Sequence, residues 1–124
     1  MSLGNIIEVT SANWKEVLKA ELPIVAEFYT PTCPYCRQLT LIFQRLAGEY
    51  AGRMVFAMVD ASQSSGIALG YGVMGVPTLK FFCAGRPIIY EVVGLRSEQE
   101  LRDEFEKVLS IHKKCVAQSS PIYG

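Results

Sequence analysis

Two cysteines three residues apart, Cys33 and Cys36, are the side chains of this chain best suited to chemistry. They stand where the apolar run 22–29 gives way to a helical pattern that begins at Pro34. A Cys-x-x-Cys pair at such a junction is a typical redox arrangement. Proline suits the first position of a helix, so Cys33 is expected to be the N-cap, where free backbone N–H groups stabilise a thiolate. The sequence therefore predicts Cys33 as a nucleophile.

Cys36 is the predicted partner of Cys33 in a reversible disulfide, because residues three apart in a helix lie on one face. A thiolate at Cys33 would attack a substrate disulfide, and Cys36 would resolve the mixed disulfide that results. The alternative, half of a zinc site, needs about four ligands. The other candidate ligands, Cys83, His112 and Cys115, are isolated in the sequence. We expect neither a metal nor an organic cofactor.

The two remaining cysteines, Cys83 and Cys115, receive no role. Cys83 ends a predicted strand, and Cys115 lies in the last helix or in the tail. Extra cysteines are usually buried and inert, so free thiols are expected here. A regulatory disulfide between them is an alternative that the pattern does not support. Four cysteines in 124 residues are too few for a disulfide scaffold, and a cytoplasmic location is the default.

Composition predicts one globular domain. Half of the 124 residues are hydrophobic and 19% are charged. Twelve basic residues balance twelve acidic ones, which argues against nucleic acid and anionic membranes as partners. No apolar run approaches the roughly 20 residues of a membrane span, and no signal peptide is visible, although a leader could have been trimmed. We expect a monomer with a cloning remnant or flexible N-terminus at 1–4, a domain at 5–116 and a flexible tail at 117–124.

The elements that must position the cysteines alternate between strands and helices. The predicted strands cover 6–9, 22–29, 54–59, 78–83 and 87–93. The predicted helices cover 12–20, capped by Thr10 or Ser11, then 34–50, 64–69 and the stretch after Ser97, where Ser97 and Glu100 form a capping box. The two-residue turn at 84–85 makes the last two strands an antiparallel hairpin. This order predicts an α/β fold, with a central mixed sheet (a parallel half plus the C-terminal hairpin) flanked by helices on both faces.

The chain resembles the thioredoxin family over roughly residues 5–113. The resemblance rests on Val25 to Cys36, the run from Tyr71 through Gly75-Val76-Pro77 to Thr78, Gly85 in the hairpin turn and Gly94 after it. It implies the thioredoxin fold and a thiol–disulfide oxidoreductase that acts on protein disulfides and takes electrons from a thioredoxin reductase or a small thiol. It also implies that the Val76–Pro77 peptide is cis. The carbonyl of that peptide and the Val76 backbone would hold an extended substrate segment.

Several positions depart from the family pattern. The dipeptide between the cysteines is Pro34-Tyr35, as is typical of glutaredoxins, whereas thioredoxins usually have Gly-Pro. Thr32 stands where a tryptophan often precedes the first cysteine. These departures bear on the reduction potential and the partner more than on the fold. We predict that Thr32, Pro34 and Tyr35 line the substrate-contact surface together with Met74 and Val76.

Glu27 is the other residue with predicted chemistry. It takes the place of a buried aspartate of the family, and Phe56 takes the place of a nearby lysine. A lone carboxylate in so apolar a strand should have a raised pKa, because burial disfavours its charge. A raised pKa suits a proton acceptor for Cys36. The structural alternative is an ion pair between Glu27 and Lys80 of the hairpin.

Two other functions compete with the preferred one, a reductant of protein disulfides. A glutaredoxin-like enzyme would use glutathione, whose carboxylates could meet Arg37, Lys80 and Arg96. The stretch 93–96 lacks the Gly-Gly-x-Asp-like turn that such an enzyme would carry. A binding or chaperone module would use the groove at Pro77 without turnover, and the intact cysteine pair counts against it.

Overall fold

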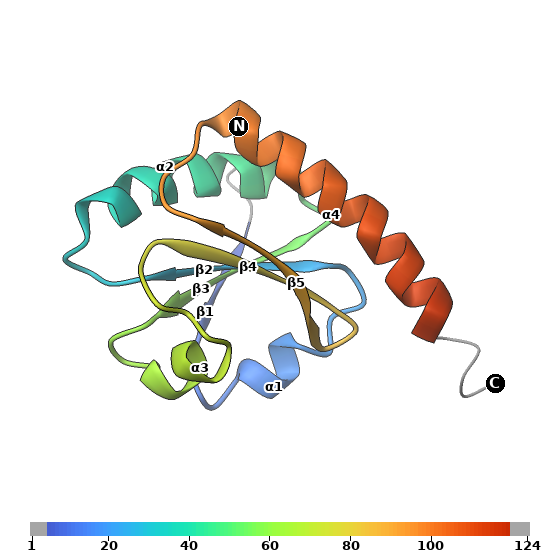
Figure 1. The fold of residues 1–124 in the computed structure, drawn as a ribbon, viewed down its shortest axis with the longest axis horizontal. Helices are drawn as coiled ribbons and strands as arrows, with labels where there is room; N and C mark the ends of the chain where they lie inside the picture. The colour runs from blue at the N-terminus through green and yellow to red at the C-terminus, as the bar shows by residue number, and fades with distance from the viewer. Residues whose placement is uncertain (1–4, 120–124) are drawn as a thin grey trace.

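The computed structural model describes residues 5–119, apart from the side chains of residues 89 and 116–119. Five strands form one mixed sheet, with helices packed on both of its faces (Figure 1). The strands are β1 (Ile6–Val9), β2 (Ile24–Tyr29), β3 (Val55–Asp60), β4 (Thr78–Cys83) and β5 (Arg86–Val93). The helices are α1 (Trp14–Val17), α2 (Pro34–Glu49), α3 (Ser65–Gly70) and α4 (Glu98–Ser119). None of these helices is both long enough and apolar enough to cross a bilayer.

The strand order is β1-β3-β2-β4-β5, which places β2 at the centre of the sheet. β1, β3 and β2 run parallel, whereas β4 is antiparallel to both β2 and β5. The predicted parallel half and C-terminal hairpin are therefore confirmed. The central position also explains the apolar sequence of β2, because helices cover both of its faces and five of its six residues are buried.

Alternate residues of β2 belong to two cores, one on each face of the sheet. Val25 packs in the core formed with α2 and α4, which also contains Leu39, Phe43, Leu101 and Phe105. Ile24, Ala26 and Phe28 pack in the core on the side of α1 and α3, with Trp14, Val17 and Ala68. Because side chains alternate along a strand, Glu27 lies on the same face as Val25, beneath α2.

The two long helices begin as the sequence predicts. α2 has Pro34 at its first position and Cys33 at its N-cap. Before α4, the backbone N–H of Ser97 donates to Glu100 Oε1 at 2.9 Å, and the N–H of Glu100 donates to Ser97 Oγ at 3.1 Å. This reciprocal pair is the predicted capping box.

Two helix boundaries differ from the prediction. α1 covers only Trp14–Val17, which is shorter than the predicted 12–20, and Asn13 directly precedes it. Thr10 caps the turn that leads into α1, because its Oγ1 accepts from the N–H groups of Ala12 at 3.2 Å and Asn13 at 3.3 Å. In return, the N–H of Thr10 donates to Asn13 Oδ1 at 2.7 Å. α4 continues to Ser119 and so includes 117–119, which the sequence assigned to the tail. The predicted N-terminal segment 1–4 and the tail residues 120–124 lie outside the described residues.

Candidate active site

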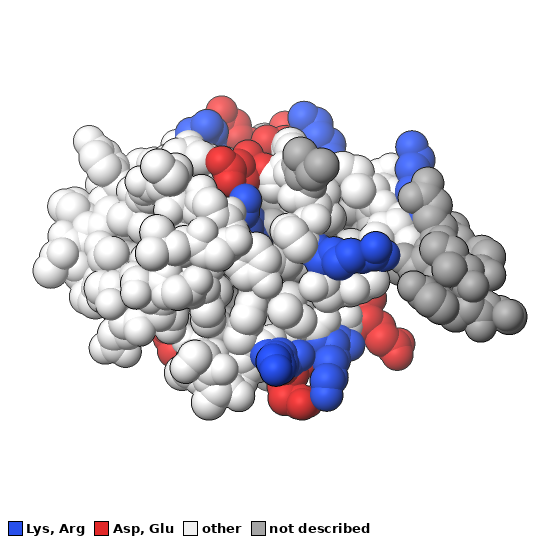
Figure 2. All heavy atoms as spheres, turned by 60° about the horizontal axis from the view of Figure 1, so that its bottom comes forward, with Lys and Arg blue, Asp and Glu red and all other residues white. Residues whose placement is uncertain are grey.

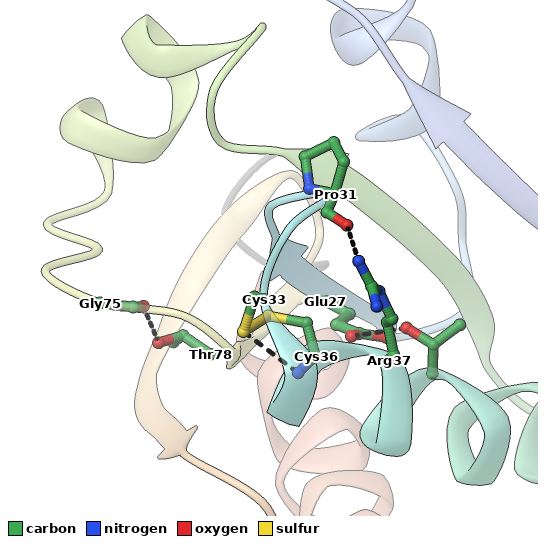
Figure 3. Close-up of a disulfide and its surroundings, with 8 residues drawn as sticks. Glu27, Pro31, Cys33, Cys36, Arg37, Gly75 and Thr78 are labelled. Carbon is green, nitrogen blue, oxygen red and sulfur yellow. Dashed lines mark hydrogen bonds between the residues drawn. A yellow bond between two sulfur atoms is a disulfide. The ribbon is translucent and has the colours of Figure 1, made fainter.

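Cys33 and Cys36 form a disulfide at the N-terminus of α2, with their Cα atoms 5.2 Å apart (Figure 3). Cys33 has an extended backbone (φ −87°, ψ 114°), as an N-cap residue requires. Its Sγ accepts a hydrogen bond from the backbone N–H of Cys36 at 3.1 Å. The backbone donor stabilises negative charge on this sulfur, so the geometry favours a Cys33 thiolate when the disulfide is reduced.

The two sulfurs of this pair differ in their access to solvent. Cys33 is half-buried, whereas Cys36 is only 2% exposed. A large substrate can therefore reach Cys33 but not Cys36. This asymmetry agrees with the prediction that Cys33 makes the intermolecular attack and Cys36 reacts within the molecule.

The loop before β4 lies on one side of the disulfide, and Glu27 lies on the other (Figure 3). The Val76–Pro77 peptide bond in this loop is cis. The carbonyl of Pro77 accepts a hydrogen bond from the backbone N–H of Gly94 at 2.9 Å. The hydroxyl of Thr78 donates to the carbonyl of Gly75 at 2.7 Å. Because the Pro77 carbonyl is already bonded, the Val76 backbone is the part of the loop suited to hold a substrate strand.

Glu27 is fully buried beneath α2. Its Oε2 accepts a hydrogen bond from the hydroxyl of Thr40 at 3.0 Å, and Oε1 has no hydrogen-bond partner within residues 5–119. Burial raises the pKa of Glu27 to about 7; the bond from Thr40 opposes this rise, and the charge of Glu8 adds to it. The predicted upward shift of the pKa therefore has the predicted cause.

Lys80 is not the partner of Glu27. In the register between β2 and β4, Lys80 lies opposite Ala26, whereas Glu27 lies opposite Leu79. Lys80 therefore sits on the other face of the sheet, because residues that lie opposite one another share a face. Its Nζ pairs instead with Glu91 Oε1 at 3.0 Å. The ion pair considered as the structural alternative for Glu27 is wrong.

A pocket of about 280 Å³ lies beside the buried cysteine. It is lined by Tyr29, Thr30, Pro31, Cys36, Arg37, Thr40 and Met58. The pocket is large enough for water, and its walls include both Cys36 and the residue that bonds Glu27. Water in this pocket would connect the Cys36 thiol to Glu27 through the hydroxyl of Thr40.

Comparison with known proteins decides the family. The family model for thioredoxin matches residues 5–107. This chain belongs to the thioredoxin family. The chloroplastic thioredoxin M-type of Spinacia oleracea is 32% identical over 110 residues, which are 88% of this chain and 60% of that protein. Thioredoxin 1 of Nostoc is 30% identical over 103 residues, which are 82% of this chain and 95% of that protein. A protein disulfide-isomerase of Oryctolagus cuniculus is 37% identical over 84 residues, which are 65% of this chain and 16% of that protein.

Exposed apolar side chains flank the cysteines of this thioredoxin-family chain. Tyr35 is 62% exposed and Met74 is 94% exposed. Thr32 and Pro34 are also exposed, and Val76 is half-buried. In Figure 2 the charged side chains gather toward the opposite end of the visible face, away from the end that holds the start of α2 and α3. The end of the molecule that holds the start of α2 therefore carries few charged side chains on the face that Figure 2 shows.

The three cations considered for glutathione do not converge. Arg37 Nη2 donates to the carbonyl of Pro31 at 3.1 Å. Lys80 is held by Glu91, and Arg96 Nη1 donates to the carbonyl of Leu95 at 3.1 Å. Separate partners hold these cations apart, so the structure offers no common site for two carboxylates among them.

Two features were missed from the sequence, one at the site and one far from it. Thr40 has no predicted role, although its position four residues after Cys36 puts both on one face of α2. Cys83 and Cys115 are not free thiols, because the structure joins them in a second disulfide. That prediction is wrong because the packing of α4 beside the end of β4 brings the two residues together.

The buried carboxyl of Glu27 predicts a pH-dependent stability. Its pKa lies near 7 in the folded chain, whereas the ordinary pKa of a glutamate is about 4.5. At a pH between these two pKa values, Glu27 therefore keeps its proton in the folded state and loses it in the unfolded state. The stabilisation is complete below pH 4.5 and is lost as the pH rises through 7. Through this carboxyl, wild type should lose up to about 3 kcal/mol of unfolding free energy between pH 4 and pH 8. Glu27→Gln has no carboxyl at this position and should not show that loss.

Urea unfolding of both proteins at the two pH values measures this difference. Glu91→Gln is the matched control, since it makes the same change at a carboxylate that is 42% exposed in its ion pair with Lys80. Equal pH dependence in the Glu27→Gln and wild-type chains would show that Glu27 does not titrate in this range.

Proposed function

We propose that this chain is a thiol–disulfide oxidoreductase that reduces protein disulfides. The Cys33 thiolate attacks one sulfur of the substrate disulfide and expels the other as a thiolate. The Cys36 thiolate then attacks the Cys33 sulfur, releases the second substrate thiolate and closes the disulfide. Two electrons thus pass from the chain to the substrate. The observation that carries the proposal is the half-exposed Cys33 at the α2 N-terminus, in reach of a buried Cys36.

Glu27 is proposed as the proton acceptor for Cys36. Cys36 must lose its proton before it can attack the mixed disulfide, and a base with a pKa near the working pH serves this step best. The bond from Thr40 and the shared pocket support a path through that hydroxyl or through one water. Substrate would lie across Thr32, Pro34, Tyr35, Met74 and Val76, next to Pro77.

Electrons for the next turnover are proposed to come from a thioredoxin reductase or a small thiol. The chain spans about 60% of the length of the spinach relative and 16% of the rabbit disulfide-isomerase. Its activity, substrates and partners are therefore proposed. The monomeric state and the absence of a metal or cofactor stay predictions. The cytoplasmic location also stays a prediction, because the spinach relative is chloroplastic by name and because stable disulfides are rare in reducing compartments.

Reduction of insulin tests the proposal. With dithiothreitol as electron source, the chain should accelerate insulin precipitation, and thioredoxin reductase with NADPH should replace dithiothreitol. Equilibration with glutathione should give a reduction potential near −270 mV, the reducing end of the range for such proteins. A potential near −120 mV would instead indicate that the chain oxidises protein thiols. A difference of about 30 mV changes the equilibrium of thiol–disulfide exchange tenfold. Activity that needs glutathione and ignores the reductase would favour the glutaredoxin-like alternative.

The exposed apolar surface predicts a selective effect on protein substrates. Tyr35→Ala and Met74→Ala should each raise KM for insulin about three- to tenfold, since burying a large apolar side chain contributes about 1.5–3 kcal/mol at most. Reduction of a small aromatic disulfide should change little, because it needs the two cysteines but no extended contact surface. Leu41→Ala is the matched control, since Leu41 is 60% exposed on the same helix. Equal loss with both substrates would contradict a role in substrate contact.

A further inference from the structure

A second disulfide joins the end of β4 to α4. Cys83 is the last residue of β4, and Cys115 lies in α4, with their Cα atoms 6.6 Å apart. The bond links positions separated by 32 residues in the sequence. Neither cysteine takes part in the exchange proposed for Cys33 and Cys36, so this disulfide is a separate covalent feature of the fold.

The second disulfide lies far from the first. β4 begins at Thr78, which lies beside the Cys33–Cys36 disulfide (Figure 3). It ends at Cys83. Five steps along a strand span about 17 Å, at about 3.4 Å for each residue. Cys33 of the same molecule therefore cannot attack the second disulfide. Its redox state must depend on thiols from outside the molecule.

The two sulfurs of the second disulfide are unequally accessible. Cys83 is 2% exposed, whereas Cys115 is half-buried. In thiol–disulfide exchange the attacking thiolate must reach one sulfur, and the other sulfur leaves as a thiolate. An external thiolate will therefore reach Cys115 and expel Cys83.

α4 makes its core contacts well before its last residue. Its fully buried side chains are Leu101, Phe105 and Val108. Leu109 packs against the same core, but Ile111 is already 37% exposed. Figure 1 shows the C-terminal part of α4 extending past the sheet. None of the side chains of residues 110–115 is fully buried, and the disulfide at Cys115 fastens this part of α4 to the body of the molecule.

This segment depends on a tether for its order. Fixing the backbone of each residue costs about 1–2 kcal/mol, and most of the stability of a helix in a protein comes from tertiary packing. The segment also forms one wall of a pocket of about 540 Å³, in which Ser110 and Lys113 of α4 face Leu22 and Pro23. Opening the disulfide would therefore loosen the helix end and remove that wall.

We propose that Cys83–Cys115 is a second thiol-exchange site, at which an external dithiol reduces the bond and releases residues 110–119. One thiolate of the dithiol attacks the Cys115 sulfur, and the Cys83 thiolate leaves and takes a proton from water. The second thiol of the dithiol then attacks its own mixed disulfide and expels the Cys115 thiolate. The dithiol loses two electrons and departs as a disulfide. This proposal does not rest on the function proposed for Cys33.

Hydrogen exchange and alkylation test the site in the chain Cys33→Ser/Cys36→Ser, which retains only the second disulfide. With dithiothreitol under native conditions, both Cys83 and Cys115 should become alkylated. Backbone amides of 110–119 should then exchange at least tenfold faster, while those of 101–108 stay unchanged. A monothiol, 2-mercaptoethanol, should leave its trapped adduct on Cys115. Reduction only after denaturation, unchanged exchange in 110–119, or an adduct on Cys83 would each overturn the proposal.

A second variant separates release of the helix from damage to the fold. Cys83→Ala/Cys115→Ala should show fast exchange in 110–119 without any reductant, and dithiothreitol should not change that exchange. Its Cys33-dependent reduction of insulin should equal that of wild type, so the two proposals fail independently. If the serine variant does not fold, alkylation of wild type resolved by peptide gives the same answer. Slow exchange in 110–119 of the alanine variant would show that the disulfide does not hold the helix end.

Discussion

Replacing Cys33 by serine should lower the rate of insulin reduction by roughly a thousandfold or more. Serine fits the N-cap of α2 and can accept the N–H bond now made to the Cys33 sulfur, so the fold should survive. A hydroxyl cannot take up the substrate sulfur in thiol–disulfide exchange, however, so no mixed disulfide can form. Insulin precipitation with dithiothreitol, after subtraction of the uncatalysed rate, measures the loss. Activity that is indifferent to this change would instead indicate a binding or chaperone module.

Cys36→Ser is the matched variant for the second half of the reaction. Cys33 should still attack, but the mixed disulfide should persist because Cys36 can no longer resolve it. Mass spectrometry after acid quenching should therefore find substrate attached to Cys33 in near-stoichiometric amount. Adducts that accumulate on Cys36 in Cys33→Ser would reverse the assigned roles. The 2% exposure of Cys36 predicts that such adducts stay rare.

Glu27→Gln should slow resolution of the mixed disulfide about a hundredfold, near the lower end of what a positioned general base contributes. The initial attack by Cys33 should proceed at the wild-type rate. Only the ionised carboxylate can accept a proton, and its pKa lies at about 7. The wild-type resolution rate should therefore rise with pH up to about 7 and then level off. Rapid-quench trapping of the Cys33 adduct measures this profile, which the Glu27→Gln variant should lack.

Thr40→Val tests whether Glu27 acts as a base, because a purely structural role of Glu27 would not change the pH profile of resolution. The bond from Thr40 lowers the pKa of Glu27, so its removal should move the pH profile of resolution upward. Thr40→Ser keeps the hydroxyl and should restore the wild-type profile. If Glu27→Gln resolves the mixed disulfide at the wild-type rate at every pH, Glu27 is not the proton acceptor. This holds whatever effect the substitution has on stability.

Features that depend on contacts within a few residues could be predicted from the sequence. Pro34 fixed the start of α2 and with it the N-cap position of Cys33, because proline lacks the N–H that has no helical partner there. Ser97 and Glu100 specified the start of α4 through a reciprocal pair three residues apart. The sequence of β2, apolar except for Glu27, required cover on both faces, which a central strand has.

Tertiary structure decided which residues meet across elements. Glu27 and Lys80 are both polar residues of neighbouring strands, and only the register between β2 and β4 shows that they lie on opposite faces. The same register turns Glu27 toward Thr40 and the pocket beside the reactive cysteines. The sequence could not show these outcomes, because strand register and helix docking sum many small contacts between distant segments. Cys83 and Cys115, 32 residues apart, form a disulfide because the packing of these distant segments brings them together.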